Sequence, residues 1–240
     1  YILVPDSVNP DSPLSKKGVR EAVQYAIDGA AIAKAVGYGY WEGANQLATS
    51  NSSVYVPDLK GRPYDPGKAK QLLTAAGYPN GFKTTISART SMNREAAVAI
   101  QSYLKEVGIE VALELMDTGR FASLNNGGWK NGFIIQFTIS MPAWLSNVNT
   151  TLSSTSVNQK SLLRPAGWQD LLERAISAPD AKTEKELSQQ LIRMASEEAF
   201  VIPFVSYGLP TVTRMNVRNP EWIYDASFGS KSPVNTWLSK

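Results

Sequence analysis

Two groups of polar and aromatic side chains could bind a small molecule, because each follows an apolar run that resembles a strand. The first group follows FKTTIS (82–87) and offers fixed hydrogen-bond donors and acceptors. The second follows NGFIIQFTI (131–139) and offers a hydroxyl, a thioether and a large ring. Ligands of open α/β sheets lie beyond the carboxyl ends of strands. The candidate ligand-binding residues are Arg89, Thr90, Asn93, Phe137, Ser140, Met141, Trp144 and Trp41.

Trp41 is a candidate for a different reason: it lies in the long irregular segment 37–63, which is rich in Gly, Asn, Ser and aromatic residues. A loop of this length within a compact domain is often functional, and aromatic side chains suit a cleft for small molecules. A single aromatic residue in a loop is nevertheless more often a loop anchor or part of the core. Both interpretations of Trp41 stay open at this point.

The composition argues against catalysis. The chain has no His and no Cys, so Ser-His-Asp and Cys-His nucleophiles and Cys/His metal sites are excluded. We therefore expect no enzyme activity, no cofactor and no metal site. A hydrolase that uses a shifted Lys or Glu as its base is an open alternative, and so is a non-catalytic interaction module.

Three partial matches to catalytic or nucleotide-binding motifs fail on spacing or context. The glycines of GYGYWEG (37–43) are one residue too far apart for a dinucleotide fingerprint. The segment Gly61–Ala69 has five residues between its glycines rather than four, and Ala69 stands where a P-loop has Ser or Thr. Ser102 and Lys105 match S-x-x-K, but they lie within an expected helix.

The charge and hydropathy patterns exclude two further classes. The net charge is +3, with 24 Lys and Arg against 21 Asp and Glu, and the longest basic runs are pairs. A nucleic-acid binder usually has a clustered basic stripe, so we expect no nucleic-acid partner. No apolar stretch approaches the length that spans a membrane.

The elements that must position the candidate residues alternate between strand and helix. The runs 82–87 and 109–116 are typical of strands, and the apolar residues within 93–107 lie on one helical face. Strand, helix and strand with short links predict a right-handed βαβ unit with parallel strands. The run 132–139 is expected to be a third strand of the same sheet, buried on both faces.

The rest of the chain is expected to contain further helices and a few strand-like runs. A short strand is expected within 1–14, and the runs 200–207 and 209–215 are also strand-like. The segment 140–163 is poorly periodic and is expected to be irregular. The expected further helices are 15–28, 30–36, 65–76, 118–125, 167–177 and 181–198.

Three segments, in the correct order, resemble the solute-binding proteins of oligopeptide, dipeptide and nickel ABC importers. They are VREAVQYAIDGAAIAKAVGYGYWEGANQL (19–47), YDPGKAKQLLTAAGYPNGF (64–82) and AVAIQSYLKEVGIEVALELMD (97–117). The second segment is long and specific, close to Y-D-P-x-K-A-K-x-L-L-x-x-A-G-Y-x-x-G-F in that family. The resemblance runs from about residue 15 to at least residue 215.

The resemblance implies one lobe of a two-lobe periplasmic-binding-protein-like fold of class II type, α/β with a mixed sheet and flanking helices. Residues 1–240 would be the second, ligand-binding lobe, and residues 200–240 a C-terminal segment that packs toward a first lobe. The start at Tyr1 without Met fits a chain whose first lobe and exported or lipid-anchored N-terminus lie upstream.

The resemblance also implies a function: a monomer outside the cytoplasmic membrane, periplasmic or lipid-anchored, captures a small solute and delivers it to permease subunits. One departure bears on the ligand. The family commonly has W-x-A-D-Y-x-D-P after the third strand, and its first Asp often pairs with a peptide's ammonium. This chain has Ser140 at that position, and a hydroxyl lacks the charge that a buried ammonium needs. The expected solute is an oligopeptide, a dipeptide or a related ligand, and Ser140 makes a neutral, anionic or metal-chelate ligand more plausible than the family pattern alone would.

Overall fold

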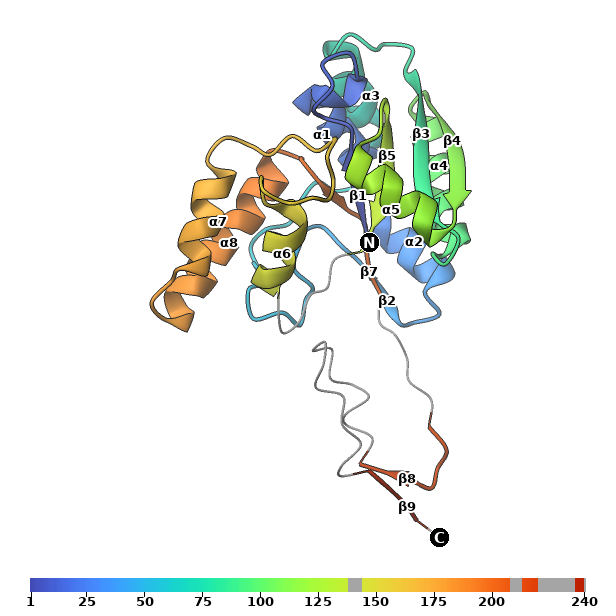
Figure 1. The fold of residues 1–240 in the computed structure, drawn as a ribbon. Coiled ribbons are helices and arrows are strands. Elements are labelled where there is room, and N and C mark those ends of the chain that lie inside the picture. The colour runs from blue at the N-terminus through green and yellow to red at the C-terminus, as the bar shows by residue number, and fades with distance from the viewer. Residues whose placement is uncertain (138–143, 208–212, 220–235, 240) are drawn as a thin grey trace.

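The computed structural model describes residues 1–137, 144–207, 213–219 and 236–239. Its centre is a five-stranded mixed sheet in the order β4-β3-β5-β1-β6 (Figure 1). The strands are β1 (Ile2–Pro5), β3 (Phe82–Arg89), β4 (Ile109–Met116), β5 (Gly132–Gln136) and β6 (Ile202–Pro203). Two strand pairs lie outside this sheet, namely β2 (Trp41–Gly43) with β7 (Val205–Tyr207), and β8 (Val217–Arg218) with β9 (Trp237–Leu238).

The predicted βαβ unit is confirmed. β3 and β4 are parallel, with Phe82 opposite Ile109 and Arg89 opposite Met116, and α4 (Arg94–Glu106) connects them. β5 is parallel to β3 on its other side. Two expected limits differ: β3 continues beyond residue 87 to Arg89, and β5 ends at Gln136, while residues 138 and 139 of the expected strand lie outside the described residues.

The sheet is buried on both faces because its central strands carry apolar residues on both sides. Leu3, Phe133 and Ile135 belong to one hydrophobic cluster, and Val4 and Ile134 belong to the other. The first cluster packs under α1 (Lys17–Ala26), α2 (Gly29–Val36), α3 (Pro66–Ala75) and α4. The second packs under α5 (Thr118–Gly127), α6 (Trp144–Leu152), α7 (Trp168–Ile176) and α8 (Ala181–Glu197). The mixed α/β lobe that the sequence predicts is therefore present.

Short polar side chains start several of these helices. Asp65 accepts a hydrogen bond from the Lys68 amide at 2.8 Å, and Pro66 follows as the first helical residue of α3. Asp28, Asn93, Asp117 and Asp180 cap α2, α4, α5 and α8 in the same way. Such caps satisfy amide groups that the helix leaves without partners. A 3-10 turn (Pro13–Ser15) precedes α1.

Two glycines join the beginnings of β3 and β4. A Cβ on Gly81 would lie on the carbonyl oxygen of Gly108, and both residues have positive φ, +72° and +90°. Glycine adopts this backbone conformation without the steric penalty of other residues. The contact fixes where β3 and β4 start, and therefore where their carboxyl ends lie.

Four expectations about loops and strands need correction. The segment 37–63 contains β2, and the expected irregular segment 140–163 contains α6. The run 200–207 forms two short strands in different sheets, β6 and β7. Of the run 209–215, residues 213–215 are not a strand and residues 209–212 lie outside the described residues.

Candidate functional site

The carboxyl end of β3 carries Arg89 beside Gln136, the last residue of β5. The register places Ser87 opposite Ile134, so the two strands end next to each other. Arg89 donates a hydrogen bond from Nη1 to Oε1 of Gln136 at 3.2 Å. Arg89 therefore belongs to the strand rather than to the loop in which the sequence placed it.

Two aromatic rings flank the guanidinium of Arg89. Its central carbon lies 4.0 Å from the centroid of the Phe121 ring and 5.5 Å from that of Phe137, close enough for the rings to attract the cation. Burial lowers the pKa of Arg89 below its ordinary value, yet an arginine stays protonated at neutral pH. No carboxylate of the described residues lies within 4.0 Å of it.

The two polar candidates after Arg89, Thr90 and Asn93, differ in the hydrogen-bonding groups that they use within the protein. Thr90 donates its backbone N–H to the carbonyl of Met116 at 2.9 Å, and the residue is exposed. Asn93 uses its side-chain oxygen to accept from the Ala96 amide at 2.8 Å. Its amide NH₂ group is therefore the part of the side chain left to donate to a ligand.

Trp41 belongs to an aromatic cluster formed by segments that are far apart in the sequence. Its ring centroid lies 5.7 Å from that of Tyr1, and the rings of Tyr1 and Tyr207 stack at 4.5 Å. Burial and the nearby Tyr207 raise the pKa of the Tyr1 hydroxyl, whereas the backbone N–H of Asn93 acts in the opposite direction. The cluster therefore lies beside the start of α4, and Tyr1 and Trp41 pack against the hydrophobic cluster under α1–α4.

The remaining candidates lie in different environments. Phe137 is 42% exposed, next to Arg89. Trp144 is buried in the cluster under α5–α8, and its Nε1 donates to the carbonyl of Leu47 at 3.3 Å. Ser140 and Met141 lie outside the described residues. The structure thus brings Arg89, Thr90, Asn93 and Phe137 to one edge, while the Trp144 ring contributes to the core.

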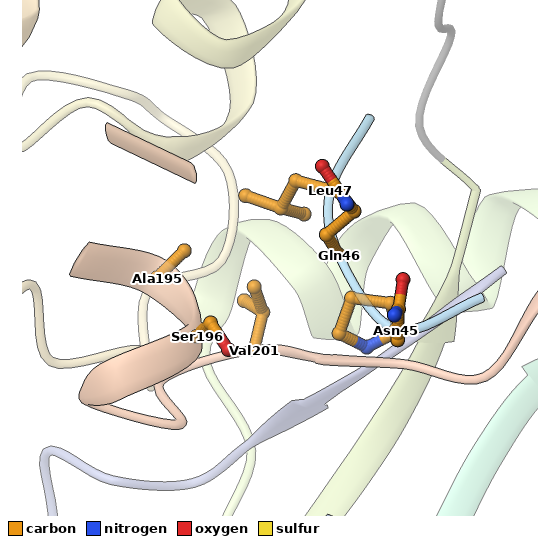
Figure 2. Close-up of a pocket in the computed structure, with 7 residues that line it drawn as sticks. Asn45, Gln46, Leu47, Ala195, Ser196 and Val201 are labelled. Atoms are coloured by element: carbon orange, nitrogen blue, oxygen red, sulfur yellow. The ribbon is translucent and has the colours of Figure 1, made fainter. Parts of the chain in front are cut away.

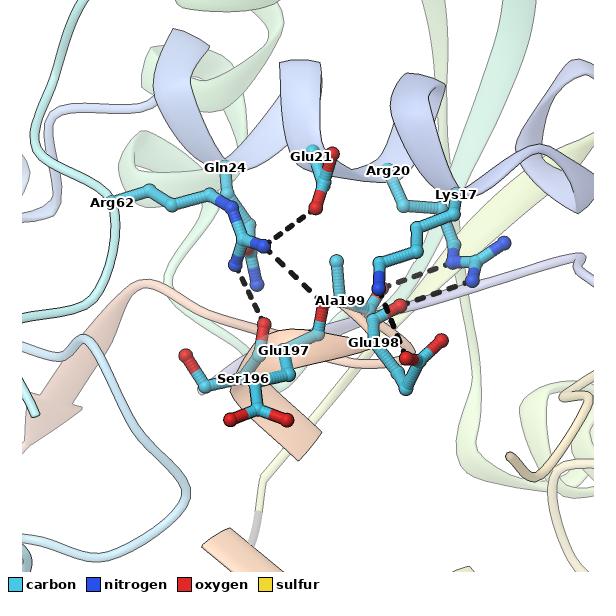
Figure 3. Close-up of polar contacts among 9 residues, drawn as sticks. All are labelled: Lys17, Arg20, Glu21, Gln24, Arg62, Ser196, Glu197, Glu198 and Ala199. Carbon is cyan, nitrogen blue, oxygen red and sulfur yellow. Dashed lines mark hydrogen bonds and ion pairs between the residues drawn. The ribbon is translucent and has the colours of Figure 1, made fainter. Parts of the chain in front are cut away.

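Two other arginines fix the carboxyl end of α8 against α1 (Figure 3). Arg20 is buried, and Arg62 is half-buried with an ion pair to Glu21 at 2.7 Å. The backbone oxygens that Arg20 contacts at 2.8 to 3.1 Å are those of Leu14, Ser15, Glu198 and Ala199. Arg62 donates to the carbonyls of Ser196 and Glu197 and to the side chains of Glu21 and Gln24. The carbonyl groups at the carboxyl end of α8 thus accept hydrogen bonds from two cationic side chains. In the chain, β6 and β7 follow directly after this end.

Two hollows in the surface are separate from Arg89. One lies where segment 45–47 meets the end of α8 (Figure 2), and it has no room even for a water molecule, so it cannot hold a drug-sized ligand. The other, of about 450 Å³, lies at the amino ends of β3 and β5. Asp6 lines it, but its carboxylate already accepts from Asn9 Nδ2 and from the Asn131 amide, each at 2.6 Å. Because ligands favour the carboxyl ends of strands, the Arg89 edge is the better candidate.

Within the described ranges, no group of three or more acidic residues is arranged to hold a metal ion. Among those same residues, no helix is long and apolar enough to cross a membrane.

Comparisons with known proteins identify the family. The profile of "Bacterial extracellular solute-binding proteins, family 5 Middle" matches residues 6–159. The chain belongs to this family. The glutathione-binding protein GsiB of Escherichia coli (strain K12) is 31% identical over 216 residues, which cover 85% of this chain and 42% of GsiB. GsiB of Shigella flexneri serotype 5b (strain 8401) is 30% identical over 217 residues, with the same coverage.

Solved structures of family 5 binding proteins and related periplasmic proteins share the fold. The periplasmic binding protein DppA of Helicobacter pylori, in complex with the peptide STSA, matches with a TM-score of 0.79 and 24% identity, over 100% of this chain and 47% of DppA. HbpA2 of Haemophilus parasuis matches with a TM-score of 0.76 and 25% identity, over 86% of this chain and 42% of HbpA2. The chain spans less than half the length of these relatives.

Sequence reasoning missed two residues of the site, Phe121 and Gln136. Phe121 lies in an expected short helix, and nothing in its local pattern points toward residue 89. Gln136 gives a weak signal, because a polar residue ends the apolar run GFII. The role of Gln136 depends on the register between β3 and β5, and that of Phe121 depends on how α5 crosses the sheet. Both are properties of the folded chain.

Proposed function

We propose that this chain is the ligand-binding lobe of the substrate-binding component of an ABC importer. It captures a small solute outside the cytoplasmic membrane at the edge formed by β3 and β5, and the complete protein delivers that solute to permease subunits. Membership of family 5 supports the class of function. The absence of His and Cys supports a binding protein without enzyme activity.

The observation that carries the proposal is the guanidinium of Arg89 at the carboxyl end of β3. It is half-buried, positively charged and without a carboxylate partner among the described residues. A partly buried cation is stabilised by an anion that forms charge-assisted hydrogen bonds with it. Glutathione, for which the curated relatives are named, carries carboxylates. A ligand with at least one carboxylate therefore fits the site.

Calorimetry on the intact gene product, including any sequence beyond this chain, tests the proposal. Reduced glutathione and small peptides are titrated, each with its carboxylates free and with them esterified. We expect at least one free acid to bind, its ester to bind more than tenfold more weakly, and Arg89→Met to remove that difference, since one charge-assisted bond changes affinity by about tenfold. Equal affinity of acid and ester, or an unchanged preference in Arg89→Met, would overturn the assignment of Arg89.

Transport has its own test, in cells. We expect deletion of the encoding gene to abolish uptake of the ligand found by calorimetry, and expression of the intact protein to restore it. If an Arg89→Met variant restored uptake as fully as the wild type does, the role of this site in delivery would be contradicted.

We also propose that residues 200–240 form a C-terminal segment that packs toward the first lobe of the complete protein, with the part beyond Tyr207 leaving this lobe. β6 belongs to the main sheet and β7 to the pair with β2, so the chain is anchored as far as Tyr207. Beyond it, the side chains of Trp237 and Leu238 are 55% and 68% exposed. Exposed apolar residues that lie close together often mark an interface. Hydrogen exchange in the intact protein is expected to show protection at β8 and β9 that is lost when the first lobe is removed.

A further inference from the structure

Several arginines are at least partly buried, and Arg20, Arg62, Arg89 and Arg164 differ in how many of their donors are used. A guanidinium carries five N–H donors. Arg164 makes five hydrogen bonds, all to backbone carbonyls. Arg20 and Arg62 make four each. Arg89 makes one with the described residues. Most of its donors therefore have no acceptor among the described residues, which leaves them suited to a ligand.

The two groups that contact Arg89 come from different elements and restrict different motions. Phe121 of α5 is fully buried, and the guanidinium lies over its ring at 4.0 Å. This contact favours one plane for the guanidinium. Gln136 of β5 is 8% exposed and accepts from Nη1 at 3.2 Å. This bond fixes the rotation of the group within that plane.

We infer that Phe121 and Gln136 are positioning residues that hold Arg89 ready to bind a carboxylate without neutralising it. The inference rests on the proposed role of Arg89 as the anion contact. It explains why the partner at position 136 is an amide: a glutamine orients the cation by a neutral hydrogen bond, whereas a glutamate of the same shape would form an ion pair and compete with the ligand.

The test compares Gln136→Glu with Gln136→Met in the full 240-residue chain. The probe is acetate, with acetamide as its neutral counterpart at the same ionic strength. The readout is the ¹⁵N-detected Nε–Hε signal of Arg89, assigned by its loss in Arg89→Lys. The signals of Arg20 and Arg164 are internal references, because carbonyls already occupy their donors.

We expect acetate, but not acetamide, to shift the Arg89 signal of the wild type and to leave the references in place. Gln136→Glu should weaken acetate binding by roughly tenfold or more, since a charged partner replaces a neutral one. Gln136→Met keeps the size of the side chain and should weaken it by a smaller factor, about threefold. Phe121→Met, which keeps volume but removes the ring, should weaken it by about threefold as well.

The outcomes separate the inference from the function on which it rests. Equal acetate affinity in the wild type and in Gln136→Glu would overturn the positioning role and leave Arg89 as the anion contact. A wild-type Arg89 signal that acetate does not shift would overturn both. If Phe121→Met does not fold, the comparison of the wild type with Gln136→Glu still tests the inference. Gln and Glu have the same shape, so a purely structural role of position 136 predicts the same acetate affinity for both.

Discussion

Arginines at the two ends of this lobe have different roles, one in the stability of the fold and the other in the candidate binding site. At the junction of α1 and α8, Arg20 is buried and four backbone oxygens accept its hydrogen bonds. At the carboxyl end of β3, Arg89 is half-buried and donates to one side chain among those that the structure describes. Burial lowers the pKa of both.

The two arginines therefore differ in burial and, more importantly for their roles, in the number of acceptors that contact them among the described residues. An arginine whose donors are used by carbonyls stabilises the fold, and an arginine whose donors are left open is suited to a ligand. We therefore expect replacement of Arg20 to reduce mainly the stability of the fold, and replacement of Arg89 to reduce mainly the affinity for the ligand.

The largest expected effect is on stability, from Arg20→Met. The variant leaves the carbonyls of Leu14, Ser15, Glu198 and Ala199 without this donor, and the free energy of unfolding should fall by about 3 kcal/mol. Arg89→Met should change it by less than about 1 kcal/mol, because the variant removes one hydrogen bond. Urea denaturation of both variants measures the difference, and equal losses would contradict the contrast between the two sites.

A second effect concerns the ammonium group of the ligand and position 140. In the intact protein, Ser140→Asp should strengthen binding of ligands with a free ammonium by about 1–3 kcal/mol if the site is desolvated. It should weaken binding of anionic ligands. Calorimetry with a peptide and its N-acetylated form measures the change. If the wild type already prefers the free amine and the variant gains nothing, another acidic group holds the ammonium.

A smaller effect is expected from Arg62→Lys. Arg62 contacts four acceptors through two nitrogens, and a lysine ammonium cannot reproduce that fork. The loss in unfolding free energy should be about 1 kcal/mol, since the charge is kept and the site is partly exposed. Thermal and urea unfolding measure it, and ligand affinity should be unchanged. A change in ligand affinity would show that the two regions are coupled.

The smallest expected effect is that of pH on carboxylate binding. Burial lowers the pKa of Arg89 below its ordinary value, but the arginine still keeps its charge near neutral pH and loses it only when the pH rises through that lowered pKa. The chain has no His. Affinity should therefore be constant between about pH 6 and pH 9, where carboxylates and arginine keep their charges. Calorimetry across this range tests it, and a midpoint near neutrality would point to another titrating group.

The sequence predicted the elements whose signals are local. The apolar face of 93–107, the cap at Asp65 and the short links predicted α4, α3 and the parallel pair of β3 and β4, all of which are present. α6 was missed because its Ser, Thr and Asn residues are weak helix formers, and packing of Val148 and Leu152 on the core compensates.

The site was predictable only in part. Arg89, Thr90 and Asn93 follow a recognisable strand, so their position at its end could be anticipated. The contribution of Phe121 could not, since it depends on how α5 crosses the sheet. Trp144 was expected at the site, but its ring is buried in the core. The sequence gives no local sign of whether an aromatic residue next to a loop lies in the core or in a site.

The position of β1 in the sheet has a consequence for the time course of folding. Its four residues are all buried, and Ile2 pairs with Gln136 on one side and with Pro203 on the other. This interior strand can pair only after β5 and β6 have been synthesised, and both come much later in the chain. Such long-range pairing slows folding and leaves apolar strands open to aggregation meanwhile. Refolding of this chain should be slow, and its yield should fall as protein concentration rises.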